Sequence, residues 1–127
     1  MEDGARVVLR QLVSLKARRE RSIRAALHAL SRRERALLAQ FDEIRVELAG
    51  LRERWRERCD IVDVLDQEAL RDLKVELGDY YLAERRFLER IDAVNRLLEE
   101  VRIERDRQNR LLQKAVIAQD KFMTLLE

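Results

Sequence analysis

Few side chains in this sequence are of the types that carry out chemistry. The chain has 127 residues, with one histidine, His28, and one cysteine, Cys59. A single thiol cannot build a thiolate metal site, and no glycine-rich phosphate loop, G-x-S-x-G or H-E-x-x-H motif occurs. Carboxylates are plentiful, but two long helices form no cleft that could separate the pKa values of a pair. We therefore expect a protein that is not an enzyme and uses no metal or cofactor.

The strongest local signal is the basic segment Lys16–Arg24, which reads Lys-Ala-Arg-Arg-Glu-Arg-Ser-Ile-Arg. A basic stretch that leads into apolar heptads superficially resembles a bZIP protein. However, residues 6–36 contain no asparagine for adenine recognition, and Ile23, Leu27 and Leu30 already occupy apolar heptad positions there. The segment also lacks the broad apolar face of a membrane-surface helix. We expect a protein-docking surface and neither nucleic-acid binding nor membrane insertion.

Composition restricts the elements that can position these residues. The chain has no proline and three glycines, and 41% of its residues are charged, against about 25% in an ordinary domain. So few turn formers cannot build a sheet with many reversals. The longest uncharged stretch, 25–31, is far too short to span a bilayer, and the N-terminus lacks the pattern of a secretion signal. These features predict long helices in a cytoplasmic protein.

Apolar residues recur with heptad spacing over most of the chain. One frame covers Ile23–Val62 and another covers Leu70–Leu126, and most of their a and d positions are apolar. Each frame holds for at least five heptads, which indicates a coiled coil. An ordinary helical bundle remains the alternative, and it would need a third apolar position in each heptad.

The two frames are separated by one inserted residue, because Val62 and Leu70 are both a positions but lie eight residues apart, where a continuous heptad pattern needs seven. Asp60, Asp63 and Asp66 surround this slip, and aspartate is a favourable residue at a helix start. We expect a single domain over 1–127, with helix one at about 5–62, a turn at about 60–67 and helix two at about 66–126. The predicted fold is an all-α, long antiparallel two-helix coiled-coil hairpin, and a single bent helix is the alternative.

A turn centred near residue 64 would bring residues whose numbers add up to 128 side by side. Every a position then faces a d position, and Phe41 faces Phe87. Glu20 could pair with Arg105 at this register. We expect the polar residues of the seam to gather in one zone, formed by Lys16, Glu20, Arg105 and Gln108. Buried polar layers of this kind set the register of a coiled coil.

Charge is uneven along the chain. Residues 1–36 hold ten Lys and Arg against four Asp and Glu, a net charge of +6, and residues 92–127 hold seven of each kind. Residues 37–91 therefore carry −4 of the total net charge of +2. A hairpin would be basic at the end with both termini and acidic near the turn.

Two long helices, an arginine-rich first helix and the ending Ala118-Gln-Asp-Lys-Phe-Met-Thr-Leu-Leu126 together resemble the type III secretion stalk proteins. This family includes FliJ of the flagellar apparatus and the YscO and HrpO proteins of injectisomes. The resemblance covers the whole chain in architecture, and the segment Gln119–Phe122 is its best local match.

The resemblance implies a hairpin whose terminal end inserts into the pore of a hexameric secretion ATPase. The hairpin would link that ring to an export gate protein at the inner membrane, and some family members also bind secretion chaperones. The residues that would face the ATPase are Arg6, Arg10, Arg18, Arg19, Arg21, Lys121 and Phe122. Toward the turn, Trp55 and Tyr81 are the candidate gate contacts, whereas Tyr80 is a d residue that we expect to fill the seam.

The leading hypothesis is therefore a non-enzymatic central stalk of a type III secretion ATPase. The alternative is a generic homodimeric coiled-coil spacer or adaptor, in which one near-continuous helix pairs with a second copy of itself.

Overall fold

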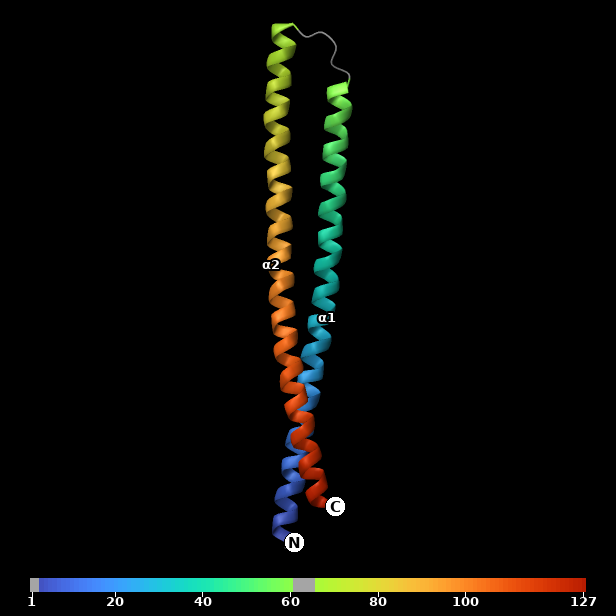
Figure 1. The fold of residues 1–127 in the computed structure, drawn as a ribbon, viewed down its shortest axis with the longest axis vertical. Helices are drawn as coiled ribbons and strands as arrows, with labels where there is room; N and C mark the ends of the chain where they lie inside the picture. The colour runs from blue at the N-terminus through green and yellow to red at the C-terminus, as the bar shows by residue number, and fades with distance from the viewer. Residues whose placement is uncertain (1–2, 61–65) are drawn as a thin grey trace. The chain divides into compact units, whose positions relative to one another are not determined.

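The computed structural model describes residues 3–60 and 66–127, which form two helices, α1 (Asp3–Asp60) and α2 (Gln67–Leu126). The helices run antiparallel and pack against each other (Figure 1). The all-α two-helix hairpin predicted from the heptads is thereby confirmed. Neither the single bent helix nor the continuous helix of the spacer hypothesis is the fold of this chain. Val62 and the turn predicted near residue 64 lie outside the described residues.

Local interactions explain where α2 begins. The Asp66 side chain accepts a hydrogen bond from the backbone N–H of Ala69 at 2.7 Å, and the Asp66 carbonyl accepts one from Leu70 at 3.0 Å. A carboxylate in this position satisfies a free N–H group of the first turn and suits the positive end of the helix dipole. Asp66 is therefore the N-cap of α2, whereas Asp60 is the last residue of α1.

The chain divides into two compact units. The terminal unit consists of Met1–Arg35 and Glu99–Glu127, and the central unit consists of Ala36–Leu98. The structure describes residues 3–35 and 99–127 of the first unit and residues 36–60 and 66–98 of the second. Each unit contains a segment of α1 packed antiparallel to a segment of α2.

Every described side chain that is buried lies at a predicted a or d position. The terminal unit contributes Ile23, Val101 and Ala115, and the central unit contributes Leu37, Ile44, Leu48, Val94 and Leu98. Several g positions of α2 are half-buried as well, namely Ala69, Glu76, Ala83, Leu97, Glu104, Leu111 and Ala118. The predicted seam is thus present, and on the g side of α2 it is wider than a strict a and d pattern implies.

The register differs from the predicted one by a heptad. In the central unit the rings of Trp55 and Tyr80 stack with centroids 5.2 Å apart and an interplanar angle of 16°. The numbers of these two residues add up to 135, and not to the predicted 128. The expected alignment of Phe41 with Phe87 is therefore wrong. A shift of seven residues keeps every a position opposite a d position, so the heptad pattern alone does not distinguish the two registers.

This register leaves the start of α2 without an α1 neighbour. Asp60 is level with Val75, so the described part of α1 ends beside the third turn of α2, and Figure 1 shows α2 continuing beyond it. Leu70 is accordingly 43% exposed although it occupies an a position. The exposure of Leu70 therefore follows from the register.

Cysteine cross-linking tests the register directly. In a Cys59→Ser background, we expect Leu37→Cys with Leu98→Cys to form a disulfide on mild oxidation, because these positions are level at a sum of 135. Leu37→Cys with Ile91→Cys is the matched control, since that pair is level only at a sum of 128. Disulfide geometry tolerates Cα separations of about 4.4–6.8 Å, which a displacement of one heptad exceeds. Non-reducing electrophoresis measures the rate of cross-linking. Faster cross-linking of the control pair would contradict this register.

The contribution of the seam to the free energy of unfolding can be measured by truncating one buried residue. Ile44 is 4% exposed, whereas nearby Val46 is 66% exposed. We expect Ile44→Ala to lower the free energy of unfolding by about 2–4 kcal/mol, because it leaves a cavity in the seam. Val46→Ala should change it by less than about 0.5 kcal/mol. Urea denaturation followed by circular dichroism measures both, and equal losses would argue against the burial pattern.

Candidate functional site

The two units differ in sign of charge. The terminal unit contains 16 Lys and Arg residues against ten Asp and Glu, for a net charge of +6. The central unit contains 11 against 15, for a net charge of −4. The compact units therefore coincide with the basic and acidic parts of the sequence.

Most arginines predicted to face an ATPase are exposed on α1 in the terminal unit. Arg10, Arg18, Arg19 and Arg21 all present their side chains to solvent. When the frame of Ile23–Val62 is continued toward the N-terminus, they occupy positions e, f, g and b, which surround the outer surface of the helix. The only acidic residue between Gly4 and Arg33 is Glu20, at an a position. This part of α1 is therefore positive on all of its outer faces and forms no single discrete patch.

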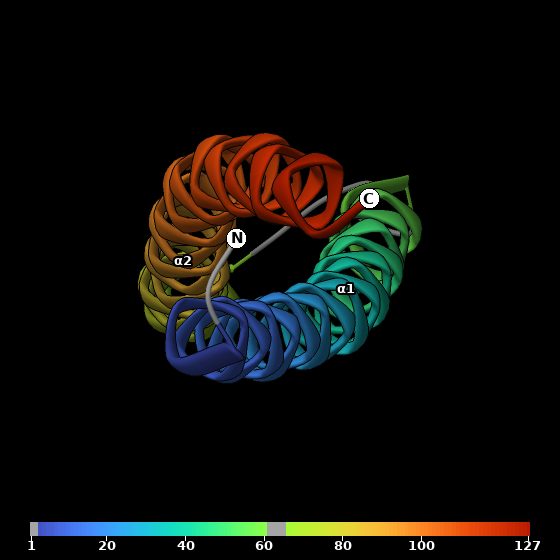
Figure 2. The same cartoon turned by 90° about the horizontal axis from the view of Figure 1, so that it is seen from below.

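Arg6 has a more specific role than general positive charge. Its Nη2 donates a hydrogen bond to the carbonyl oxygen of Leu126 at 3.3 Å, across 120 residues of sequence. Figure 2 looks along the helices from the end where the start of α1 and the end of α2 lie opposite each other. The last turn of α2 contains no basic residue of its own, so the Arg6 guanidinium supplies the cation that stabilises a helix C-terminus.

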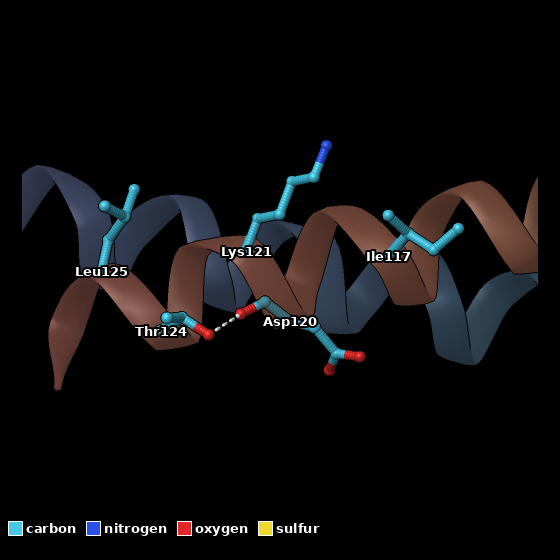
Figure 3. A pocket seen from close by; sticks show the side chains of 5 residues that line it. All are labelled: Ile117, Asp120, Lys121, Thr124 and Leu125. Atoms are coloured by element: carbon cyan, nitrogen blue, oxygen red, sulfur yellow. Dashed lines mark hydrogen bonds between the residues drawn. The ribbon is translucent and has the colours of Figure 1, made fainter.

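Lys121 and Phe122 lie on different sides of α2. Phe122 is half-buried at a d position, where it fills the seam, and Lys121 is exposed. Figure 3 shows Lys121 projecting to the same side as Ile117 and Leu125, and the Asp120 carboxylate projecting to the other side. The Thr124 hydroxyl donates to the Asp120 carbonyl at 2.9 Å. These five residues line a shallow hollow on the surface of α2: Ile117, Asp120, Lys121, Thr124 and Leu125.

The polar residues of the seam do not form the predicted single zone. Arg105 donates two hydrogen bonds to Glu34, from Nη1 at 3.0 Å and from Nη2 at 2.7 Å. The predicted pairing of Arg105 with Glu20 is wrong, because Glu20 accepts hydrogen bonds from Arg24 on its own helix. Gln108 donates to Glu104 at 2.9 Å, and Lys16 is half-buried. At the observed register Lys16 is level with Gln119, about two heptads from Arg105.

The Glu34–Arg105 pair perturbs both of its members. The hydrogen bond and charge of Arg105 hold the pKa of Glu34 below its ordinary value of 4.5, and partial burial opposes this shift. The same contact raises the pKa of Arg105. A two-pronged guanidinium–carboxylate contact is directional as well as strong. Because both residues are a positions that interrupt an apolar seam, this cross-helix pair helps to define the register.

The lowered pKa of Glu34 predicts a pH-dependent contribution to stability. Below pH 4.5 the unfolded chain binds a proton at this carboxyl more readily than the folded chain, so the contribution is present above pH 4.5 and is lost as pH falls through the folded-state pKa. We expect Glu34→Gln to lower the urea midpoint at pH 7 and the difference from wild type to shrink below pH 4.5. Glu100→Gln, at an exposed position, serves as the control. A difference that stays constant with pH would be inconsistent with this role.

An aromatic cluster lies in the central unit. Half-buried Trp55 stacks on Tyr80, and the Tyr81 ring lies 5.5 Å from that of Tyr80 at an angle of 60°. Tyr81 itself is 58% exposed, whereas Tyr80 fills the seam as predicted. Of the two tip candidates, only Tyr81 therefore offers most of its side chain for contact with another molecule. A surface hollow beside the cluster is lined by Leu51, Arg54, Trp55, Arg58, Glu76, Asp79, Tyr80 and Ala83.

Hydrogen bonds join this cluster to two charged groups. The Tyr80 hydroxyl donates to Glu84 at 2.7 Å, and Arg52 Nε donates to the same carboxylate oxygen at 3.2 Å. The bond from Tyr80 is the main cause that lowers the pKa of Glu84, and the same bond raises the pKa of Tyr80. Sequence reasoning missed this network, although Tyr80 and Glu84 are both seam positions spaced by one helical turn.

The remaining chemically capable residues are isolated. His28 and Cys59 are exposed, and Cys59 is a free thiol. Over residues 3–60 and 66–127, no group of three or more His, Cys, Asp or Glu side chains is placed to hold a metal ion. Neither described helix has a stretch long and apolar enough to cross a membrane. The described surface therefore offers charged and apolar faces for contact with other molecules.

Comparison with known proteins adds no assignment, because no family model, no curated protein and no solved structure matches this chain.

Proposed function

We propose that this protein is a non-enzymatic central stalk of a type III secretion ATPase. In this function the terminal unit seats in the pore of the hexameric ring, and the central unit contacts an export gate protein. Secretion chaperones are further proposed partners. The protein would act in the cytoplasm, at the part of the secretion apparatus that borders the inner membrane.

The observation that carries this proposal is the combination of the hairpin with its charge. Both ends of the chain belong to one compact unit, where Arg6 contacts Leu126, and that unit has a net charge of +6. A continuous positive surface favours association with an acidic partner by long-range attraction. The exposed arginines of α1 are available for such contact.

The helices suit a component that transmits position or torque. Their backbones are regular, since the described residues include no positive φ and no cis peptide bond. The chain has no proline to interrupt the hydrogen bonds of either helix. Cross-helix ion pairs, such as Arg105 with Glu34 and Arg58 with Glu76, resist sliding of one helix past the other.

The central unit supports a second, different contact. Its net charge of −4 is opposite to that of the terminal unit, and Tyr81 exposes a large aromatic side chain beside the Trp55–Tyr80 stack. Exposed tyrosines are frequent anchors of protein interfaces. We assign the gate contact to this face of the central unit.

Charge reversal on α1 tests the proposal. We expect the triple variant Arg18→Glu, Arg19→Glu and Arg21→Glu to lose binding to a type III secretion ATPase from the same organism, and to lose stimulation of ATP hydrolysis, by at least about tenfold. The physical reason is that six units of charge change on the surface that we assign to the ring. Pull-down and a steady-state ATPase assay measure the two effects.

The matched control places the same charge change in the central unit, as Arg45→Glu, Arg71→Glu and Arg86→Glu, all at exposed positions. This control should retain binding and stimulation within about twofold, and circular dichroism should show unchanged helicity in both variants. Equal loss in both would indicate a general charge effect, and no loss in the first would reject the assignment of the ring-facing surface.

A further inference from the structure

The positions beside the seam determine what else can pack on the hairpin. In the central unit, Arg90 and Glu47 form a cross-helix ion pair at 3.5 Å, and both residues occupy g positions. The g positions of the two antiparallel helices therefore face each other on one side of the seam. The e positions lie on the opposite side.

In the terminal unit, the side of the seam with the g positions carries apolar residues, whereas in the central unit the same side carries this ion pair. The g position Leu12 is half-buried, and next to it on α1 the c positions Val8 and Leu15 are more than half exposed. On α2 the g positions Ala118 and Leu125 lie beside Ile117, which is 56% exposed. We name these six residues the terminal apolar face: Val8, Leu12, Leu15, Ile117, Ala118 and Leu125.

The α2 part of this face is hollowed. Lys114, Ala118, Phe122 and Leu125 are among the side chains that line a depression there, so its floor reaches the seam residue Phe122. In Figure 3 the side chains of Ile117, Lys121 and Leu125 project to the same side of the helix, and the Asp120 carboxylate projects away from them. The depression is therefore apolar at its centre and bordered by lysines.

At the g, c and f positions, the charges around the terminal apolar face have one sign. Arg19 on α1 and Lys114 and Lys121 on α2 occupy its g and c positions. No acidic residue occupies a g, c or f position in residues 4–33 or 107–125. Asp120, the one acidic residue in 107–125, is a b position on the e side, and the nearest acidic g position is Glu104, one heptad before Leu111. Over residues 107–125 the carboxylate and the apolar g positions therefore lie on opposite sides of α2.

We propose that the terminal apolar face is the docking site for an acidic amphipathic helix of another protein, which would pack beside the seam as a third helix. The apolar g positions Leu111, Ala118 and Leu125 recur every seven residues, which is the spacing that a partner helix with heptads can match. The surrounding lysines and arginine complement glutamates at the edges of such a helix.

Two other occupants fit the observations less well. A second copy that docked through the same face would bring basic residues against basic residues, which is unfavourable. A lipid surface requires neither heptad spacing nor a hollow that reaches the seam. The six apolar residues are not among those assigned to the ring, but they belong to the same terminal unit, and Arg19 and Lys121 beside them are assigned to the ring, so a third helix and the ring would compete for this unit.

The test uses the full chain and two synthetic peptides of four heptads. The first has Leu at a and d and Glu at e and g, and the second is identical except for Lys in place of Glu. We expect the acidic peptide to bind in a fluorescence anisotropy titration, and the basic peptide to bind at least about tenfold more weakly. Equal binding of the two peptides, or no binding of either, would overturn the proposal.

Variants locate the peptide on the chain. Val8→Ser with Leu125→Ser should weaken binding of the acidic peptide by at least about tenfold, because it removes two exposed apolar contacts on the g side. Val7→Ser with Met123→Ser is the matched control, since these neighbouring residues are similarly exposed, at 49% and 48%, but occupy b and e positions. The control should change binding by less than about twofold, and equal weakening in both variants would reject the site.

Two further measurements distinguish the other occupants. Self-association of the wild-type chain that is lost in the Val8→Ser, Leu125→Ser variant, measured by sedimentation equilibrium without peptide, would reassign the face to a second copy. Co-sedimentation with phosphatidylglycerol vesicles that is lost in the same variant, together with absence of peptide binding, would reassign it to a lipid surface. Either outcome contradicts the proposal.

Discussion

The narrow apolar seam between α1 and α2 is the constraint on which the rest of the structure depends. Two helices alone can bury only the side chains that point directly at each other, and the eight buried residues among those that the structure describes are all a or d positions. Almost every other side chain must therefore tolerate water, which explains why so much of the chain is charged. The same constraint leaves the outer faces free to differ between the terminal and central units in charge and in apolar content.

Polar interruptions give this seam its alignment. Leucine, isoleucine and valine pack with little preference among registers that differ by a heptad, whereas a carboxylate in the seam needs a specific donor. Glu34 meets Arg105 from the other helix, and Glu84 meets both Tyr80 and Arg52. Each of these seam carboxylates is satisfied at the observed register, so the residues that weaken apolar packing also select one arrangement.

The fold followed from the sequence more readily than the register did. Heptad spacing identified nearly all seam positions, because burial on one stripe of a helix imposes that spacing directly. It did not reveal that Tyr80 stacks on Trp55. The register that places Phe41 opposite Phe87 differs from the observed one by seven residues and satisfies the same heptad pattern. The exposure of Arg10, Arg18, Arg19 and Arg21 follows from the same spacing, since these four residues lie outside the stripe. The hydrogen bond from Arg6 to the Leu126 carbonyl depends on the alignment of the two helices, and so does the apolar g side of the terminal unit. Neither could be predicted without knowing that alignment.

The stack of Trp55 on Tyr80 gives the chain an internal optical probe. Trp55 is the only tryptophan, and it belongs to the central unit. Its emission therefore reports the contact between the helices in that unit alone, whereas far-ultraviolet circular dichroism averages both units. Separation of the helices around Trp55 would change this emission, so a difference between the midpoints of the two signals would show that the units melt independently.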